Sequence, residues 1–189
     1  ALVADPDIDA LYVATPHPFH KDASILCLEA GKAVLCEKPF TINAAEAEAV
    51  VTVASTNGVF LMEAMWSRYL PVMAQVRQWL AEDAIGEPLV VSADFGFRAN
   101  VDPEGRLFSP ALGGGALLDI GIYVVSFAAM VLGAQPDRIA AAAHLGKTGV
   151  DEQAGVVLGY PGGGIATLSC AVRASTPHEA RITGSKGTI

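Results

Sequence analysis

Short unbroken apolar runs alternate with longer segments of helical periodicity over the first third of the chain. The apolar runs cover residues 8–15, 33–36 and 59–62, and they are rich in β-forming side chains. The segments between them, residues 21–30 and 44–55, carry apolar side chains at helical spacing. This pattern predicts strand, helix, strand, helix, strand.

Capping residues support both helices. Gly31 follows the first helix, where a left-handed C-cap is expected. Asn43 precedes the second helix and Glu46 stands three residues later, which is the spacing of a capping box. The Asn57-Gly58 pair is expected to end that helix.

Continuously apolar strands separated by helices are typical of a parallel sheet that is covered on both faces. Ligands of such sheets bind beyond the carboxyl ends of the strands. Each predicted strand ends in polar or unusual residues. They are Thr15-Pro16-His17, Glu37-Lys38-Pro39 and Glu63-Ala64-Met65-Trp66. The sequence therefore predicts a binding site at this edge.

The pattern changes after residue 65. It predicts a helix at 71–80, an alternating run at 88–97, a polar loop at 100–110 and a helix after the glycines at 113–115. Two alternating segments, 155–160 and 165–172, flank a Pro-Gly-Gly-Gly turn and predict a hairpin, and 176–183 predicts another strand. The expected fold class is α/β. A partial Rossmann-like parallel sheet (1–64) precedes an α+β domain with a mostly antiparallel open sheet (65–189).

Composition narrows the choice of partner. The 189 residues are 52% hydrophobic and 17% charged, with a net charge of −8. Nucleic acids and anionic membrane surfaces need clustered basic residues, so neither is expected as a partner. Cys27, Cys36 and Cys170 are widely spaced, which predicts buried thiols in a reducing compartment such as the cytoplasm. Residues 116–134 are apolar but contain Asp119, and they predict a buried helix.

A dinucleotide fold should open with a G-x-G-x-x-G turn, and the first third of the chain has none. Either the fold is different, or the chain begins after its first βαβ unit. The abrupt apolar start favours the second reading.

Four motifs occur in order. They are Ala14-Thr15-Pro16 with His20, Glu37-Lys38-Pro39, Glu63-Ala64-Met65-Trp66-Ser67-Arg68, and the run from Gly113 to Tyr123 that includes Asp119-Ile120-Gly121-Ile122-Tyr123. In this arrangement the chain resembles the Gfo/Idh/MocA oxidoreductases. It is similar to the branch that contains dimeric dihydrodiol dehydrogenase and NADP-dependent xylose dehydrogenase.

The resemblance implies an NAD(P)-dependent dehydrogenase acting on a small sugar, polyol or diol. It implies NADP or NAD as cofactor, with NADP favoured, and a homodimer. It also implies a cis Lys38-Pro39 bond. The cofactor-binding residues that it implies are Thr15, Pro16, His20, Glu37, Lys38, Pro39 and Trp66.

Lys38 and Tyr123 form a chemically sensible pair, and the resemblance implies that both are catalytic. An ammonium near a phenol stabilises its phenolate form, so that Tyr123 can exchange a proton while hydride moves to or from the nicotinamide. Asp119 lies four residues before Tyr123, on the same face of a helix.

Arg106, Asp119 and Arg68 are the candidate substrate residues. Asp119 could equally cap the glycine turn, and Arg106 could be a solvated surface residue. Trp66 could stack on the ligands or pack the domain junction. His17 and His20 lack a carboxylate or cysteine at ligand spacing, so no metal site is expected. A catalytically silent NAD(P)-sensing regulator is the alternative function. A third expectation is that the 189 residues alone do not bind cofactor.

Overall fold

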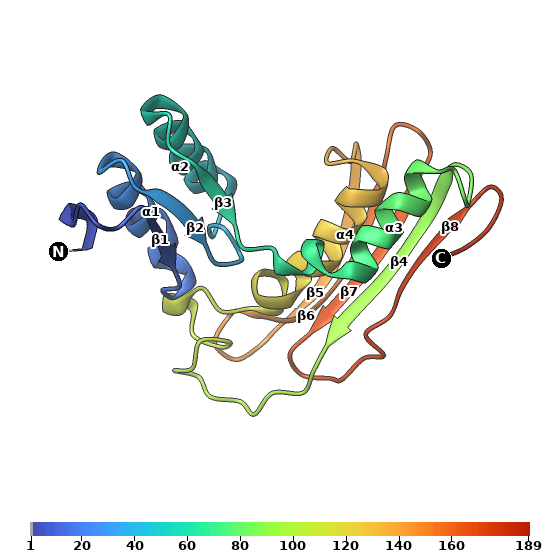
Figure 1. Ribbon diagram of the computed structural model, residues 1–189. Coiled ribbons are helices and arrows are strands. Elements are labelled where there is room, and N and C mark those ends of the chain that lie inside the picture. The colour runs from blue at the N-terminus through green and yellow to red at the C-terminus, as the bar shows by residue number, and fades with distance from the viewer. Residues whose placement is uncertain (1) are drawn as a thin grey trace. The chain divides into compact units, whose positions relative to one another are not determined.

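The computed structural model describes residues 2–189, which form two compact units (Figure 1). The first unit contains Ala1–Met65 and the short segment Ala111–Gly113. The second contains Trp66–Pro110 and Gly114–Ile189. The chain thus passes from one unit to the other next to the boundary that the sequence pattern predicts.

The first unit is a three-stranded parallel sheet with two helices. Its strands are β1 (Ala10–Val13), β2 (Ala33–Cys36) and β3 (Leu61–Glu63), in the order β1-β2-β3. The helices are α1 (His20–Glu29) and α2 (Ala44–Asn57). Val13 is level with Cys36, and Cys36 is level with Glu63. The carboxyl ends of all three strands therefore lie at one edge, as the sequence predicts.

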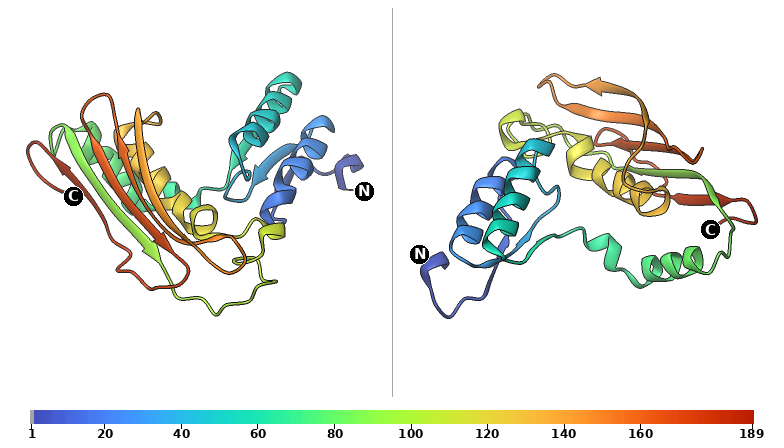
Figure 2. Two further views of the ribbon diagram at one scale, coloured as in Figure 1. Left: turned by 180° about the vertical axis from the view of Figure 1, so that it is seen from behind. Right: turned by 90° about the horizontal axis from the view of Figure 1, so that it is seen from above.

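Both helices cover the same face of this sheet. Right-handed crossovers that step in one direction along a sheet place their helices on one side, and Figure 2 shows α1 and α2 side by side. The covered face buries Val13, Val34 and Cys36. On the opposite face Tyr12 and Leu35 remain 58% and 37% exposed. The expectation of cover on both faces is wrong for the described residues, because they contain no crossover in the reverse direction.

The predicted caps of the helices are present, but the capping box is half formed, because among residues 2–189 the Glu46 side chain does not accept the backbone N–H of Asn43. The side-chain oxygen of Asn43 accepts the backbone N–H of Glu46 at 2.9 Å, which satisfies one of the free donors at the start of α2. Gly58 ends α2 with a left-handed φ of 62°. Gly31, after α1, has a φ of 76°. Glycine is favoured at both positions because a Cβ strains this conformation.

The second unit contains a five-stranded mixed sheet with the order β5-β6-β7-β4-β8. Its strands are β4 (Pro88–Gly96), β5 (Arg138–Leu145), β6 (Asp151–Gly159), β7 (Ile165–Ala171) and β8 (Ala180–Gly184). Only the β4–β7 pair is parallel, and the other three pairs are antiparallel. The mostly antiparallel sheet expected from the sequence is confirmed.

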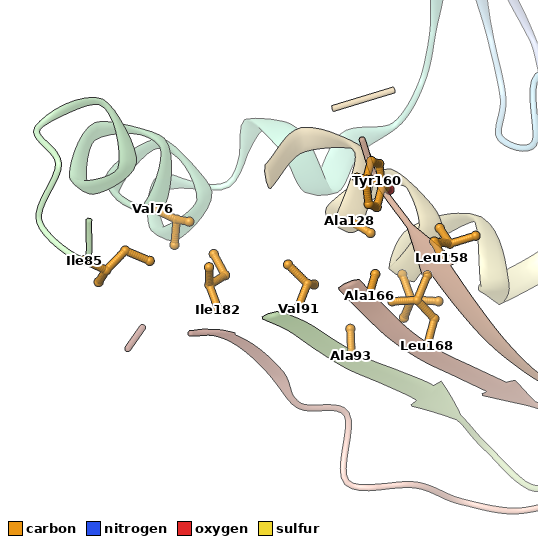
Figure 3. Packing of buried hydrophobic residues seen from close by; sticks show 11 residues of the cluster. Val76, Ile85, Val91, Ala93, Ala128, Leu158, Tyr160, Ala166, Leu168 and Ile182 are labelled. Atoms are coloured by element: carbon orange, nitrogen blue, oxygen red, sulfur yellow. The ribbon is translucent and has the colours of Figure 1, made fainter. Parts of the chain in front are cut away.

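Helices α3 (Pro71–Ala81) and α4 (Ile122–Leu132) pack on one face of this sheet. Figure 3 shows the core, in which Val76 of α3 and Ala128 of α4 face strand residues such as Val91 and Leu168. The segment Pro110–Leu132 is long and apolar enough to span a membrane by length and composition alone. Since Val124 and Ala128 are buried against the sheet, α4 has the packing of a core helix.

The sequence pattern misses strand β5. All eight of its residues are exposed, because it is an edge strand that pairs only with β6. Its sequence, Arg-Ile-Ala-Ala-Ala-Ala-His-Leu, is rich in alanine and lacks a buried face that would enforce an alternating pattern. Backbone pairing with β6 therefore defines this strand, and the side chains carry little signal for it.

Burial changes the acidity of two thiols. All three cysteines are free and buried, as expected. Burial raises the pKa of Cys36 from 9.0 to about 11, and the nearby carboxylates of Glu63 and Glu37 add to the effect. Burial also raises the pKa of Cys170 to about 11, with a contribution from the charge of Asp151. Both thiols therefore stay protonated in the fold over a pH range in which they ionise in an unfolded chain.

Stability is expected to fall between about pH 9 and pH 11. A raised folded-state pKa favours folding fully below the unfolded value, and that contribution disappears as the pH rises to the folded value. Two pKa units correspond to about 3 kcal/mol for each thiol. The check is urea unfolding across this range, with Cys36→Ala and Cys170→Ala each compared with the unaltered protein. The assignment would be contradicted if the pH dependence of stability in each variant equalled that of the unaltered protein.

Candidate active site

The carboxyl edge of the first sheet is organised around His20. This side chain is 1% exposed at the start of α1. Its Nε2 lies 2.8 Å from the carbonyl oxygen of Thr15, and its Nδ1 lies 2.9 Å from the carbonyl oxygen of Pro39. One imidazole thus connects the loop after β1 to the loop after β2, and it fixes the two segments that carry most of the predicted cofactor residues.

Replacing His20 with leucine is expected to destabilise the first unit. Leucine fills the space but removes the ring N–H that donates to one of the carbonyls of Thr15 and Pro39, and a buried acceptor left without its hydrogen bond costs about 1–3 kcal/mol. Denaturant unfolding measures the loss. His144→Leu, which alters an exposed histidine on β5, serves as the control. An unchanged midpoint for His20→Leu would show that the bridge does not stabilise the fold.

Glu37 and Lys38 follow β2 directly, and the Lys38–Pro39 peptide bond is cis, as the resemblance implies. The Glu37 carboxylate accepts the hydroxyl of Tyr12 and, at 3.0 Å, the backbone N–H of Lys38. Glu37 is therefore engaged in local structure. Its carboxylate raises the pKa of Tyr12 mainly through this hydrogen bond.

The third strand end completes the edge. Glu63, the last residue of β3, accepts the backbone N–H of Phe40 at 3.0 Å. The loop that contains Lys38 is thus held by His20 on one side and by Glu63 on the other. Lys38 itself is half-buried. A cluster of three or more metal-ligating side chains does not occur among residues 2–189, and His17 contacts the Gly113 carbonyl at 3.0 Å.

In the second unit, the glycine run and Asp151 set the start of the helix that carries Asp119 and Tyr123. A Cβ on Gly114 would lie 2.8 Å from the Leu107 carbonyl oxygen, so only glycine permits this approach. Asp151 accepts the backbone N–H of Leu117 at 2.7 Å and caps the helix. Burial raises the pKa of Asp151, although the hydrogen bonds that it accepts oppose the shift.

The first turn of this helix, Leu117–Gly121, is a π-helix, which the sequence does not predict. Asp119 lies within it, is 4% exposed, and pairs with Arg106 at 2.7 Å. The side chain of Arg106 remains 60% exposed, so the guanidinium keeps donors at the surface. The structure thus brings two predicted substrate residues together. This pairing gives Asp119 a structural role as a buried anchor for the loop that carries Arg106.

Tyr123 lies in the first turn of α4 and is half-buried. The indole Nε1 of Trp66 donates a hydrogen bond to its hydroxyl at 2.8 Å, and the two rings meet edge to face with centroids 5.8 Å apart. The ring of Phe95 packs against it at 5.4 Å. Trp66 therefore orients the phenol. The sequence had left its role open between stacking on the ligands and packing the domain junction.

A cavity of about 240 Å³ adjoins Tyr123 within the second unit. Its walls are mainly apolar, from α3, α4 and β4, with a few polar groups. Arg68 lines it and donates to the Ser126 hydroxyl at 2.9 Å. A lining that is mainly apolar with a few placed polar groups is typical of ligand pockets, most of which are larger, at about 300–1,000 Å³.

Sequence reasoning missed several residues of this cavity. Phe95, Asp94, Ser126 and His178 all line it. Phe95 and Asp94 belong to β4. The alternation of apolar and polar residues predicts this strand, but it does not show which of its residues line a ligand cavity. His178 precedes β8 in a loop with no motif. Its left-handed backbone is a structural signal that the sequence does not display.

Comparison with known proteins gives the same picture for both units. Residues 1–65 match the family described as "Oxidoreductase family, NAD-binding Rossmann fold". Residues 73–189 match "GFO/IDH/MocA C-terminal domain". A trans-1,2-dihydrobenzene-1,2-diol dehydrogenase from Mus musculus is 46% identical over 187 residues, which is 98% of this chain and 56% of that protein. The chain thus spans little more than half the length of this relative.

Solved structures agree. An aldose-aldose oxidoreductase from Caulobacter crescentus, complexed with glycerol, has a TM-score of 0.92 at 30% identity over 99% of this chain and 57% of that one. A 3-ketoreductase from Actinomadura kijaniata, in complex with NADP and TDP-benzene, has a TM-score of 0.88 at 32% identity over 97% and 57%. The chain belongs to the Gfo/Idh/MocA family of oxidoreductases.

Proposed function

We propose that this chain is the catalytic part of an NAD(P)-dependent dehydrogenase that interconverts a hydroxyl and a carbonyl group on a small sugar, polyol or diol. The observation that carries the proposal is the Tyr123 hydroxyl, bonded to Trp66 beside a cavity of ligand-binding character. Matches to dehydrogenases and oxidoreductases along nearly the whole chain support it.

The residues of the first unit fit the nicotinamide end of a dinucleotide. Thr15, Pro16 and Lys38 lie at the carboxyl edge of a parallel sheet, where dinucleotides bind. Thr15 and Pro16 are exposed there, while the carbonyl of Thr15 is held by His20. We assign these three residues to cofactor binding, with Trp66 from the second unit. Glu37 and Pro39 support the loop, and NADP is the favoured form.

The bound cofactor supplies hydride acceptance and donation. In the oxidative direction Tyr123 takes the proton of a substrate hydroxyl, while a hydride leaves the carbon that bears this hydroxyl. Trp66 holds the phenol in place by donating to its oxygen. The Lys38 ammonium stabilises the phenolate form of Tyr123. Arg68 and Arg106 bind substrate oxygens.

The test is a kinetic and binding study of the intact protein. We expect reduction of NADP⁺ in the presence of trans-1,2-cyclohexanediol, D-xylose or myo-inositol, and weaker activity with NAD⁺. Cofactor binding without turnover of any sugar, polyol or diol would overturn the proposal in favour of a cofactor-sensing regulator. Absence of cofactor binding would overturn both functions.

We also propose that the intact protein is a cytoplasmic homodimer. The sheet face opposite α3 and α4 exposes the apolar side chains of Val90, Val157 and Ile165. Val90 pairs with Ile165, and Val157 pairs with Thr167 two residues further on, so these side chains share one face. A second copy would cover them. Light scattering is expected to give a dimer, and Val157→Lys is expected to give a monomer; a monomeric unaltered protein would contradict this.

A further inference from the structure

His178 has a backbone conformation that side chains rarely adopt. Its φ of 62° lies in the left-handed region, which histidine tolerates better than most residues. The Asp94 carboxylate holds it there, because it accepts the backbone N–H groups of His178 at 2.9 Å and Glu179 at 3.2 Å. Residues in sparsely populated conformations persist where their surroundings fix them, and they gather at ligand sites.

The Asp94 clamp is charged at neutral pH. Burial alone raises the pKa of Asp94. The two backbone N–H groups that it accepts oppose this effect, and the net shift of its pKa is downward. The clamp therefore persists throughout the pH range in which a dehydrogenase is assayed.

The hydrogen bonds of the His178 ring define its protonation pattern. Its Nε2 lies 2.6 Å from the carbonyl oxygen of Gly96. A carbonyl oxygen only accepts, so Nε2 must carry the hydrogen. In the neutral ring Nδ1 is then an acceptor, and among residues 2–189 it has no hydrogen-bond partner. An imidazole whose tautomer is set by one bond offers its other nitrogen to a ligand.

Phe95 packs against both His178 and Tyr123. The ring of Phe95 lies 4.8 Å from that of His178 and 5.4 Å from that of Tyr123, between centroids. Both polar residues line the same cavity of about 240 Å³. One ligand in this cavity can therefore contact both residues.

We propose that His178 is a specificity-determining residue that accepts a hydrogen bond from a second substrate hydroxyl. The substrate class is a six-membered ring with more than one hydroxyl, such as a cyclic polyol or a pyranose. The inference rests on the proposed dehydrogenase function and adds to it how the substrate is selected. The apolar walls of the cavity contact the faces of the substrate ring, and His178 accepts a hydrogen bond from the second hydroxyl.

The test compares 1,4-cyclohexanediol with cyclohexanol as substrates of the intact protein. The unaltered protein is expected to prefer the diol. His178→Phe keeps a ring against Phe95 but lacks the acceptor, and it is expected to raise KM for the diol about three- to tenfold. Its kcat for both substrates and its KM for cyclohexanol should stay unchanged. Equal losses with both substrates, or none, would overturn the proposal.

Two further variants cover the folding risk and nonspecific effects. Phenylalanine is strained at a left-handed position, so His178→Asn provides a second test, since asparagine adopts that conformation readily. It is also expected to lose the preference for the diol, because its side chain is shorter. His144→Phe, outside this cavity, is expected to behave like the unaltered protein.

Binding separates this inference from the proposed function. In a Trp79→Phe background, Trp66 is the remaining tryptophan of this chain, and it contacts Tyr123. Quenching of its fluorescence by 1,4-cyclohexanediol measures affinity without turnover. Weaker binding in His178→Phe supports the role of His178 even if no turnover occurs. Unchanged binding together with normal turnover would overturn this role alone.

Discussion

Replacing Tyr123 with phenylalanine is expected to lower kcat at least a hundredfold while the dissociation constant for the cofactor stays the same. The substitution removes one oxygen atom. That oxygen accepts the hydrogen bond of Trp66 and is the proposed proton acceptor for the substrate. A positioned general base contributes about 10²- to 10⁴-fold to a rate. The ring packing against Phe95 is preserved, so the loss reflects the proton transfer.

Steady-state kinetics and a nucleotide titration of the intact protein provide the measurement. Tyr160→Phe is the matched control, because Tyr160 is buried in the core of the same unit. That variant should keep its rate. If Tyr123→Phe weakened cofactor binding as strongly as it lowered kcat, Tyr123 would be a binding residue and not the acid–base group.

Replacing Lys38 with methionine is expected to produce a loss of similar size with a different pH profile. Methionine has a similar length but no charge, so the proposed stabilisation of the Tyr123 phenolate by Lys38 would be lost. The rising limb of the pH–rate profile is then expected at higher pH. Because Glu37 and Glu63 bond to the backbone of this loop, the loop should remain folded.

The measurement is kcat against pH for Lys38→Met. Lys21→Met is the control, since Lys21 pairs with its neighbour Asp22 on α1. A uniform loss at every pH, with no displacement of the limb, would show that Lys38 positions the substrate or cofactor without acting on the acid–base step.

Local patterns in the sequence predicted most of the fold. Strand β2 was located to the residue, and the caps at Asn43 and Gly58 were placed, because these features depend on neighbouring residues. Strand β5 was missed because its side chains bury nothing. The π-helical turn was missed because no pattern in the sequence distinguishes it from an α-helical turn.

The predicted site residues occur at the strand ends and on α4, but their partners could not be read from the sequence. His20 was identified, whereas its bonds to Thr15 and Pro39 depend on how two loops meet. Trp66 was identified, whereas its bond to Tyr123 joins residues far apart in the chain. His178 carried no signal, since its conformation is imposed by Asp94 on another strand. Short motifs therefore identify site residues, whereas the contacts that define their roles come from segments far apart in the chain.

The position of β4 in the sheet affects how the second unit folds during translation. This strand pairs with β7 in parallel and with β8 in the antiparallel sense, and both partners lie beyond α4, β5 and β6 in the chain. During synthesis Val91 and Ala93 emerge well before the strands that bury them. Closing so long a loop is slow, and an unpaired apolar strand is prone to aggregate meanwhile. Chaperone demand during translation is therefore expected to end only once β8 has left the ribosome.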